Sequence, residues 1–474
     1  ALPEAYSNYT SLFDLLLETL LGFGTLIVAM EREHRDLEVA NEQLRAAREK
    51  LEAMARVDPL TSSLNRHAFY SMVEGHRATG GPSGCVAVVD LDALKPVNDT
   101  FGHAAGDQAD RFARQELYPL SARMDADEWW PAEAFPKIGA TGYFGIPIPE
   151  AYGGAGLDSL TAAVAVEELS RGSASLAVTV SVSNSVCAGP IVRYGTEEQR
   201  RRYLPILASG QILGGFSLTE PDSGSDASRL RTRAIRDGDS YVLNGDKAWV
   251  TNAQVGRLFV ILCVTDPAQG ARGITAFLVE KGTAGFRLGK DEVKLGITCS
   301  GSVEMVFEDC AVPAGNRLGE EGQGFKIAMS TLDGGRIGIA AQAVGIARAA
   351  LEDATRYARE RKAFGKSIGE FQAIQFMLAD MATEIDAARL LTHRAAWAKD
   401  QGGRYSTEAA QAKLFASEAA MRAAVKGVQI FGGYGYMNEY PMERYFRDAK
   451  ITEIYEGTKE IQKNTIAGSL IKKK

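Results

Sequence analysis

The order in which hydrophobic patterns change along the 474-residue chain constrains its fold more than any other feature. Between 214 and 313, short segments rich in Val, Ile and Phe alternate with Gly, Asp and Asn turns, including Asp237-Gly238 and Asn244-Gly245. Short apolar segments between such turn residues are typical of antiparallel strands. This part of the chain is therefore predicted to form a β-domain, with bounds at 214–319.

Helical patterns lie on both sides of the predicted β-domain. Before it, apolar residues recur at helical spacing over 111–123, 160–171 and 197–207. After Gly324 the chain becomes Ala-rich and periodic over 337–361, 371–399 and 408–430, as in a bundle of long antiparallel helices. We therefore expect a multidomain α+β protein with a helical N-terminal domain (110–213), the central antiparallel β-domain and a C-terminal helical bundle (320–474).

Composition excludes several kinds of partner. The formal net charge of -7 and the pI near 5.5 provide no general attraction to nucleic-acid phosphates. The five cysteines form no Cys-x-x-Cys pair and the histidines lie at no metal-ligand spacing, so we expect free thiols in a reducing cytoplasm and no catalytic metal. The most apolar segment, 11–30, is interrupted by Asp14 and Glu18, so we expect no firm membrane association and no secretory signal.

Residues 1–57 are predicted to contain an amphipathic segment followed by a signalling helix. Between 31 and 56, Leu37, Leu44 and Leu51 recur every seven positions with small or apolar residues between them. This a/d pattern predicts a coiled coil, and a solvated single helix is the alternative. Asp58-Pro59 ends the helix, because proline disfavours helix in the residue before it.

An apolar strand pattern at 85–92 ends in Asp90 and Asp92, a common way to present carboxylates to a metal-bound phosphate. Together with the motifs at 58–69 and 98–107, it resembles the opening half of the GGDEF diguanylate cyclase domain. The resemblance implies that Asp90 is a metal ligand and that Asn98 and Asp107 contact a guanine nucleotide. The family's Gly-Gly-Asp/Glu-Glu-Phe turn does not follow, so we interpret 58–109 as a truncated, partial α/β segment without cyclase activity.

A carboxylate can act as a general base where the backbone brings it close to a ligand. Glu456 precedes Gly457 at a predicted break between two helices, where the backbone can approach a ligand closely. A carboxylate beside an apolar acyl chain loses hydration, and its pKa rises toward that of a useful base. The alternative is a helix-capping Glu in a glycine turn.

Five motifs from Asp110 onward resemble the acyl-CoA dehydrogenase family in order and spacing, namely Phe216 to Asp226, Lys247 to Asn252, Glu360 to Gly365, Gln429 to Gly433 and Ile454 to Thr458. The likeness is closest to short-chain, butyryl-CoA dehydrogenase-like members, in 332–340 and 449–458. It implies FAD-dependent conversion of an acyl-CoA thioester to the trans-2-enoyl-CoA, with Glu456 as base, flavin N5 as hydride acceptor and an electron-transfer flavoprotein as partner. An oxidase of the same fold and a signalling fusion are alternatives.

The resemblance also assigns the cofactor and substrate contacts. The loop after Phe216 offers hydroxyls and free N–H groups that suit the flavin edge, with a plain surface turn and a core tryptophan as alternatives. The implied flavin-ring residues are Phe216, Leu218, Thr219, Ser225, Trp249, Val250 and Thr251. The implied substrate residues are Ser225, Asp333, Arg336, Tyr455 and Gly457, although Asp333 and Arg336 could also be an ordinary (i, i+3) ion pair.

A guanidinium suits a pyrophosphate because it donates in a planar fork. The resemblance assigns a second group of residues to the dinucleotide part of a flavin bound in a neighbouring subunit: Arg361, Phe364, Gln372, Gln429, Gly432, Gly433, Thr458 and Glu460. A ligand shared between chains implies a homo-oligomer, with a dimer of dimers expected, whereas pairing of Arg361 with an acidic neighbour is the alternative. The chain departs from the short-chain pattern at Thr298, where an Arg is usual, and this affects either domain contacts or the substrate entrance.

Overall fold

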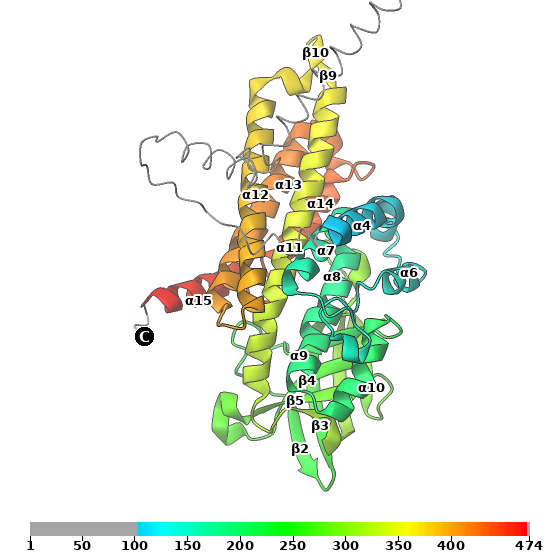
Figure 1. Ribbon diagram of the computed structural model, residues 1–474, viewed down its shortest axis with the longest axis vertical. Coiled ribbons are helices and arrows are strands. Elements are labelled where there is room, and N and C mark those ends of the chain that lie inside the picture. Colours follow the sequence, from blue (N-terminus) through cyan, green and yellow to red (C-terminus); the bar gives the residue numbers. More distant parts are fainter. Residues whose placement is uncertain (1–102, 472–474) are drawn as a thin grey trace, which may run out of the picture. The chain divides into compact units, whose positions relative to one another are not determined.

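The computed structural model describes residues 103–471. The coiled coil expected over 31–56, the strand-end carboxylates Asp90 and Asp92, and Asn98 of the GGDEF-like segment lie outside the described residues. Asp107 lies inside them, exposed on the first helix. The described residues begin with helices, continue with a sheet and end with a second set of helices, as the hydrophobic pattern predicts (Figure 1).

The N-terminal part is helical throughout. Its elements are α4 (His103–Phe112), the π-helix η2 (Ala113–Leu117), α5 (Tyr118–Ala126), α6 (Ala134–Ala140), the 3-10 helix η3 (Glu150–Tyr152), α7 (Ser159–Gly172), α8 (Ala174–Val182), the π-helix η4 (Ser183–Ala188), α9 (Gly189–Tyr194) and α10 (Glu197–Ala208). The helices predicted over 160–171 and 197–207 are confirmed as α7 and α10. Asp158 caps α7 by accepting from the Thr161 N–H at 2.8 Å, and Thr196 forms a capping box with Gln199 at the start of α10.

The helix predicted over 111–123 begins earlier than expected, at His103. Helices α4, η2 and α5 follow one another without a break, so residues of the GGDEF-like segment form the first turns of this N-terminal part. Ala109 is fully buried, and an added side chain at Gly106 would touch Val164 of α7 at 3.3 Å. These first turns are therefore packed against the helical domain.

The run from Ala174 to Tyr194, over α8, η4 and α9, was not predicted as a helix. It is apolar on all faces, with a mean hydropathy of 1.4 over its most apolar window, of which 83% is buried inside the protein. A helix without a polar face has no helical periodicity to detect, which explains why the pattern missed it. Burial makes this segment a core helix of the described part of the chain.

The sheet has the strand order β6-β7-β3-β2-β4-β5-β8, and β1 pairs with β4. Its strands are β1 (Gly214–Ser217), β2 (Arg233–Asp237), β3 (Ser240–Thr251), β4 (Leu258–Val264), β5 (Ile274–Glu280), β6 (Phe286–Asp291), β7 (Ser302–Pro313) and β8 (Arg317–Leu318). The sheet is antiparallel as predicted, except that β1 and the first residue of β2 pair with β4 in parallel. The turn predicted at Asp237-Gly238 is confirmed between β2 and β3. Short 3-10 helices η5 (Pro267–Gly273), η6 (Thr298–Ser300) and η7 (Ala314–Asn316) connect the strands.

The turn predicted at Asn244-Gly245 is wrong, because both residues lie inside β3, at an irregularity in its pairing with β7. Gly245 has φ 138°, and Asn244 exchanges hydrogen bonds with Asp309, accepting from its N–H at 2.8 Å and donating to its carboxylate at 3.2 Å. The extra residue at this irregularity lies on β7, but Gly245 still adopts a positive φ, as a glycine in a hairpin turn does, so the dipeptide alone does not distinguish the two.

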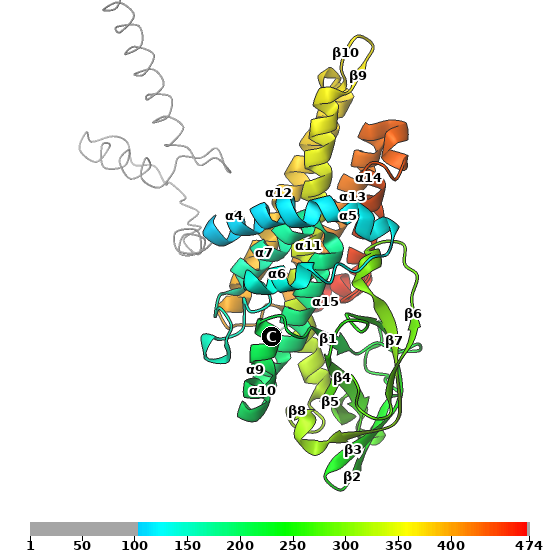
Figure 2. The ribbon, with the colours of Figure 1, turned by 90° about the vertical axis from the view of Figure 1, so that its right-hand side faces the viewer.

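The C-terminal helices confirm the three long helices predicted from the Ala-rich periodicity. The elements are α11 (Gly324–Glu360), the hairpin β9 (Lys362–Ala363) and β10 (Lys366–Ser367), the 3-10 helix η8 (Ile368–Glu370), α12 (Gln372–Asp400), α13 (Ser406–Phe431), the 3-10 helix η9 (Gly432–Tyr436), α14 (Met442–Thr452) and α15 (Lys459–Ile471). Helix α11 runs from beside the sheet to the β9–β10 hairpin at the far end of the bundle (Figures 1 and 2).

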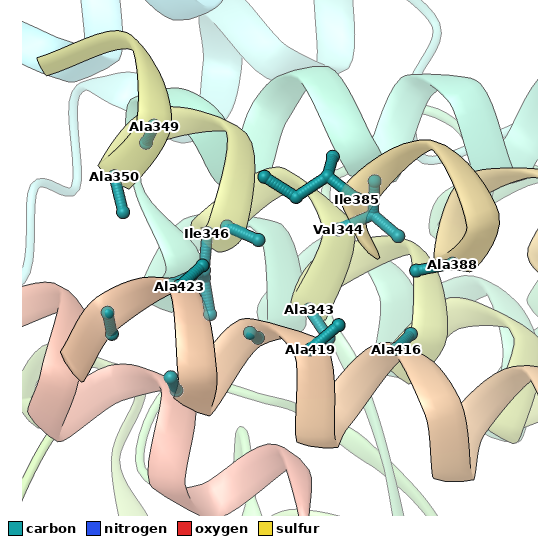
Figure 3. Packing of buried hydrophobic residues seen from close by; sticks show 14 of the residues in the cluster. Ala343, Val344, Ile346, Ala349, Ala350, Ile385, Ala388, Ala416, Ala419 and Ala423 are labelled. Carbon is teal, nitrogen blue, oxygen red and sulfur yellow. The ribbon is translucent and has the colours of Figure 1, made fainter. Parts of the chain in front are cut away.

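Small side chains form the centre of the bundle (Figure 3). Ala343 of α11 lies close to Ala416 and Ala419 of α13, and all three are buried. Alanine at the contact lets helix backbones approach closely, and it has the highest intrinsic helix propensity. The close approach matters for function, because it brings residues of α11 and α13 to the short segment between α14 and α15.

Candidate active site

The segment between α14 and α15 contains Glu456 in a left-handed conformation. Glu456 has φ 52° and the following Gly457 has φ 97°. A left-handed glutamate is costly, so the surrounding groups must hold it. Arg336 of α11 donates to the Glu456 carbonyl at 3.4 Å, and Gln462 of α15 donates to the carbonyls of Glu456 and Gly457 at 3.2 and 2.8 Å.

The Glu456 side chain is directed toward α11. One carboxylate oxygen, Oε2, is buried and has no hydrogen-bond partner among the described residues. Burial raises the pKa of Glu456 to about 7, although Arg336 and Lys413 oppose the rise. A carboxylate with this pKa can accept a proton near neutral pH and has an oxygen free to do so.

Gly335 provides the space that the carboxylate occupies. A Cβ atom added at Gly335 would lie 1.9 Å from Oε2 of Glu456, whereas one added at the adjacent Gly334 would come no closer than 3.5 Å to any neighbour, the nearest being Lys399. Both glycines are in the middle of α11, where alanine favours the helix. Gly335 lies between Asp333 and Arg336, which the resemblance assigned to the substrate site, but no sequence pattern indicated that it makes room for a carboxylate.

Gly335→Ala is therefore expected to displace the Glu456 carboxylate while the bundle stays folded. A displacement of about 1 Å at a reacting group lowers turnover by about a hundredfold. The measurement is the steady-state rate with an acyl-CoA, together with the melting temperature, in Gly335→Ala and in the matched control Gly334→Ala. Equal rates in both variants would contradict the proposed proximity.

The loop after β1 is anchored by a buried ion pair. Lys247 is fully buried and Glu220 is 4% exposed, and their charged atoms are 2.7 Å apart. The Glu220 carboxylate also accepts from the backbone N–H groups of Arg231 and Thr232. Burial opposes its ionisation, but Lys247 and these donors still hold the pKa of Glu220 below its usual value. The pair fixes the loop that begins at Phe216 against β3.

Trp249 extends from a bulge in β3. Between Lys247 and Val250, β3 has one residue more than the facing part of β7. Trp249 has φ 55° and is 61% exposed, which is a strained conformation for a large aromatic residue that buries little surface in this chain. Such strain is typical of a residue that contacts a ligand or partner. The Ala248 N–H donates to the Thr219 carbonyl at 2.9 Å, so the bulge and the loop are adjacent.

One small apolar cluster connects the loop to the Glu456 segment. It consists of Val178, Val182 and Val186 of the helices α8 and η4 and Ile339 of α11, and both Phe216 and Tyr455 pack against it. The cluster therefore places Phe216 of the predicted flavin loop and Tyr455 of the predicted substrate site against the same helices. Ser225 is exposed on the loop, Thr219 and Thr251 are partly buried, and Leu218 and Val250 have buried side chains and can offer only their backbones.

Asp333 and Arg336 form the expected ion pair on one face of α11, with 2.6 Å between Oδ1 and Nη1. The pair is mostly buried, and the Ser406 hydroxyl also donates to Asp333. Because Arg336 reaches the Glu456 carbonyl as well, the pair belongs to the surroundings of the candidate base. Tyr455 donates its hydroxyl to the Gln342 side chain.

The residues predicted for the dinucleotide lie elsewhere. Arg361 follows the last residue of α11, and the 26 positions between it and Gly335 span about 39 Å at the rise of an α-helix. Near it are the exposed Phe364 at the hairpin tip, with φ 51° and 96% exposure, and Tyr434, whose ring is 5.4 Å from the Arg361 guanidinium. Gln372, Gln429, Gly432 and Gly433 are also exposed there, whereas Thr458 and Glu460 lie beside Glu456. One chain thus does not bring the two groups together.

Two side chains that hold the Glu456 segment were not predicted from the sequence. Lys413 donates to the Gly457 carbonyl at 2.8 Å, and Gln462 completes the set of donors. The available signal for Lys413 was its position within the Ala-rich face of α13, where it is fully buried among Ala409, Ala412 and Ala416. A lysine on an apolar helix face indicates a specific partner, because an unpaired buried charge is costly.

Thr298, which departs from the family pattern, lies at a contact between domains. Its hydroxyl donates to the Asp125 carboxylate of α5 at 3.1 Å. Arg447 of α14 donates to both oxygens of the same carboxylate, at 3.0 and 2.5 Å. Because the Arg447 guanidinium already pairs with the Asp125 carboxylate, the structure favours the interpretation that the change at Thr298 affects a contact between domains.

A buried, unpartnered carboxylate oxygen on one segment, and a loop and bulge that offer hydroxyls, backbone N–H groups and an exposed tryptophan, are features of an enzyme that binds an organic cofactor. Three family models give the specific match: the N-terminal, middle and C-terminal domains of acyl-CoA dehydrogenase match 103–211, 215–310 and 322–471. The chain belongs to the acyl-CoA dehydrogenase family. Residues 55–120 also match the diguanylate cyclase GGDEF domain.

Individual proteins and solved structures similar to this chain belong to the same family. The short-chain specific acyl-CoA dehydrogenase of Clostridium acetobutylicum is 50% identical over 361 residues, which is 76% of this chain and 95% of that protein. The structure of butyryl-CoA dehydrogenase from Megasphaera elsdenii has a TM-score of 0.77 at 47% identity and covers 78% of this chain and 98% of its own. A structure described with the electron transferring flavoprotein of Acidaminococcus fermentans has a TM-score of 0.78 at 50% identity, with the same coverage.

Members of this family use FAD, and the described residues fit this cofactor. The Ser217 hydroxyl at the end of β1 and the Asn252 side-chain oxygen after β3 are buried and have no hydrogen-bond partner among the described residues. Both follow the strands that lead to the predicted flavin loop and bulge. Unpartnered polar atoms, hydroxyls and an exposed tryptophan together suit a ring with polar edges and an aromatic face.

Proposed function

We propose that the protein oxidises short-chain acyl-CoA thioesters to trans-2-enoyl-CoA, with Glu456 as the base that removes the α-proton. The observation that supports this most is the Glu456 carboxylate itself. One of its oxygens is buried without a partner among residues 103–471, and burial raises its pKa to about 7. A general base works best when its pKa lies near the working pH.

The surrounding residues position the substrate in this proposal. The backbone N–H of Glu456 donates to the thioester carbonyl and stabilises the negative charge that develops there. Arg336 and Asp333 hold the segment and line the acyl-CoA site, together with Ser225, Tyr455 and Gly457. Loss of hydration keeps the Glu456 carboxylate basic. The ordered backbone fixes the direction of its side chain.

Bound FAD supplies the hydride acceptor for the β-carbon. The loop residues Phe216, Leu218, Thr219 and Ser225 would hold its ring on one side, and Trp249, Val250 and Thr251 on the other. We propose that the separate Arg361 group binds the dinucleotide part of a flavin in a second copy of the chain. The separation of about 39 Å along α11 supports this assignment and with it a homo-oligomer.

We further propose that electrons leave through an electron-transfer flavoprotein. The similarity to a structure described with such a protein supports this choice. An oxidase that passes electrons to oxygen is the competing function for the same fold.

The test is an anaerobic titration of the purified yellow protein with acyl-CoA thioesters of increasing chain length. We expect short chains to bleach the flavin absorbance, and air to restore it far more slowly than an electron-transfer flavoprotein does. Absence of bleaching by any thioester would contradict the proposal, and rapid aerobic turnover that forms one hydrogen peroxide per product would replace it with the oxidase function.

A further inference from the structure

Lys413 is an ammonium group in the middle of the alanine-lined face of α13. Its side chain has no exposed surface. Its Nζ donates to the Gly457 carbonyl at 2.8 Å. Taking a lysine out of water is unfavourable unless the charge gains a partner, so the contact with the Glu456–Gly457 segment needs an explanation.

The peptide between Glu456 and Gly457 is held from three helices. Arg336 comes from α11, Lys413 from α13 and Gln462 from α15, and each donates to one or both carbonyls of these two residues. Both residues have positive φ, a conformation that a glutamate adopts only under constraint. The donors on the carbonyls thus fix the direction in which the Glu456 side chain leaves the backbone.

Charged residues from the neighbouring helices lie around the Glu456 carboxylate and the Lys413 ammonium group. Lys413 and Arg336 lower the pKa of Glu456 against the effect of burial. Burial likewise lowers the pKa of Lys413 to about 7, while Glu456 opposes that fall and Arg336 adds to it. Glu453 at the end of α14 and Glu460 of α15 also act on Lys413, but Glu453 is paired with Lys450 and Lys459, and Glu460 is exposed.

We propose that Lys413 is a positioning residue for the catalytic base: its hydrogen bond to the Gly457 carbonyl fixes the left-handed turn, and its protonated form favours the ionised carboxylate of Glu456. This inference rests on the proposed function of Glu456. Lys413 does not reach the reacting atoms itself. It acts through the backbone and the electrostatic potential at one carboxylate.

Two substitutions separate the two effects. Lys413→Gln removes the charge but keeps an N–H donor, and Lys413→Met removes both with a similar volume. Without the positive charge of Lys413, the pKa of Glu456 rises. The acid limb, which is the part of the pH profile where the bleaching rate increases with pH, should therefore move to higher pH by about one unit in both variants. Lys413→Met is also expected to lose about tenfold in the high-pH plateau rate, because the turn is no longer fixed. KM for the acyl-CoA should change less than twofold.

The matched control is Lys426→Met, a lysine further along α13 that pairs with Asp380 at 3.0 Å on the bundle surface. Its pH profile should equal that of the parent protein. Stopped-flow bleaching from pH 6 to 9 and thermal unfolding of all three variants provide the measurements. A wild-type acid limb in both folded Lys413 variants would overturn the inference.

Glu456→Gln distinguishes this outcome from failure of the proposed function. If Glu456→Gln bleaches normally, the base is wrongly assigned and the proposed function fails. If Glu456→Gln is inactive and both Lys413 variants keep the parent profile, only the role of Lys413 is refuted. If neither Lys413 variant folds, Lys413→Arg, which keeps the charge, must retain the parent acid limb; a shifted limb in this variant refutes the role.

Discussion

Replacement of Glu456 with glutamine is expected to leave a yellow, FAD-loaded protein that an acyl-CoA no longer bleaches. The amide fills the same volume but cannot accept the α-proton, so the bleaching rate should fall by about a thousandfold or more. Because burial raises the pKa of Glu456 to about 7, the parent rate should increase as the pH rises through that value. Anaerobic stopped-flow mixing with a short-chain acyl-CoA measures both effects.

The control for this variant is Glu439→Gln, a glutamate exposed after η9. It should bleach at the parent rate. Stability gives an independent check: since the folded-state pKa of Glu456 lies above the usual 4.5, ionisation of this group costs folding free energy above that pH. Glu456→Gln should therefore melt no lower than the parent protein at pH 8. Rapid bleaching in the variant would refute the assigned base.

Lys247→Met is expected to cause the largest loss of stability, about 3–5 kcal/mol. The substitution leaves the Glu220 carboxylate buried without its ion-pair partner, which was 2.7 Å away. The flavin loop between Phe216 and Ser225 should then lose its anchor to β3, so FAD should dissociate more readily. Urea unfolding monitored by circular dichroism gives the stability, and fluorescence of released flavin gives the loss of cofactor.

The double variant Glu220→Gln with Lys247→Met provides the control for the buried pair. Its unfolding free energy should recover by about 2 kcal/mol relative to Lys247→Met, because no uncompensated charge remains. A Lys247→Met protein as stable as its parent would mean that the pair does not anchor the loop. Replacement of the exposed Lys290, which pairs with Glu292 on the surface, should change stability by less than about 1 kcal/mol.

Local patterns predicted much of the fold. The long helices α11, α12 and α13 were predicted because a one-sided apolar stripe repeats at helical spacing over many turns. The segment from Ala174 to Tyr194 could not be predicted in this way, since burial on all sides removes the polar face. Asn244-Gly245 was mistaken for a turn because a bulge and a hairpin need the same backbone freedom.

The candidate site was predicted where its residues are close in the sequence. Glu456 and Gly457 stand next to one another at a helix break, and the loop after Phe216 carries its own composition signal. Gly335 gave no such signal, and Lys413 gave only its position on an apolar helix face, because their functions depend on how α11 and α13 pack around a segment that follows both in the chain. Non-local packing of this kind has no sequence period to detect.

The two predicted groups of cofactor residues differ in where one chain places them. The resemblance assigned the Arg361 group to a flavin in a neighbouring subunit, and one chain places this group at the hairpin end of α11, away from Trp249. Residue types and spacing alone do not show in which chain such residues act. Exposure of Phe364 on a positive-φ turn is a structural sign that this end of the bundle meets a partner.

Hydrogen exchange at the α-carbon tests the central claim most directly. A short-chain acyl-CoA incubated anaerobically with the FAD-loaded protein in D2O should be recovered with deuterium at the α-carbon, as detected by mass spectrometry, and Glu456→Gln should incorporate none above background. Deuterium incorporation by Glu456→Gln at the parent rate would show that another group removes the proton and would contradict the mechanism.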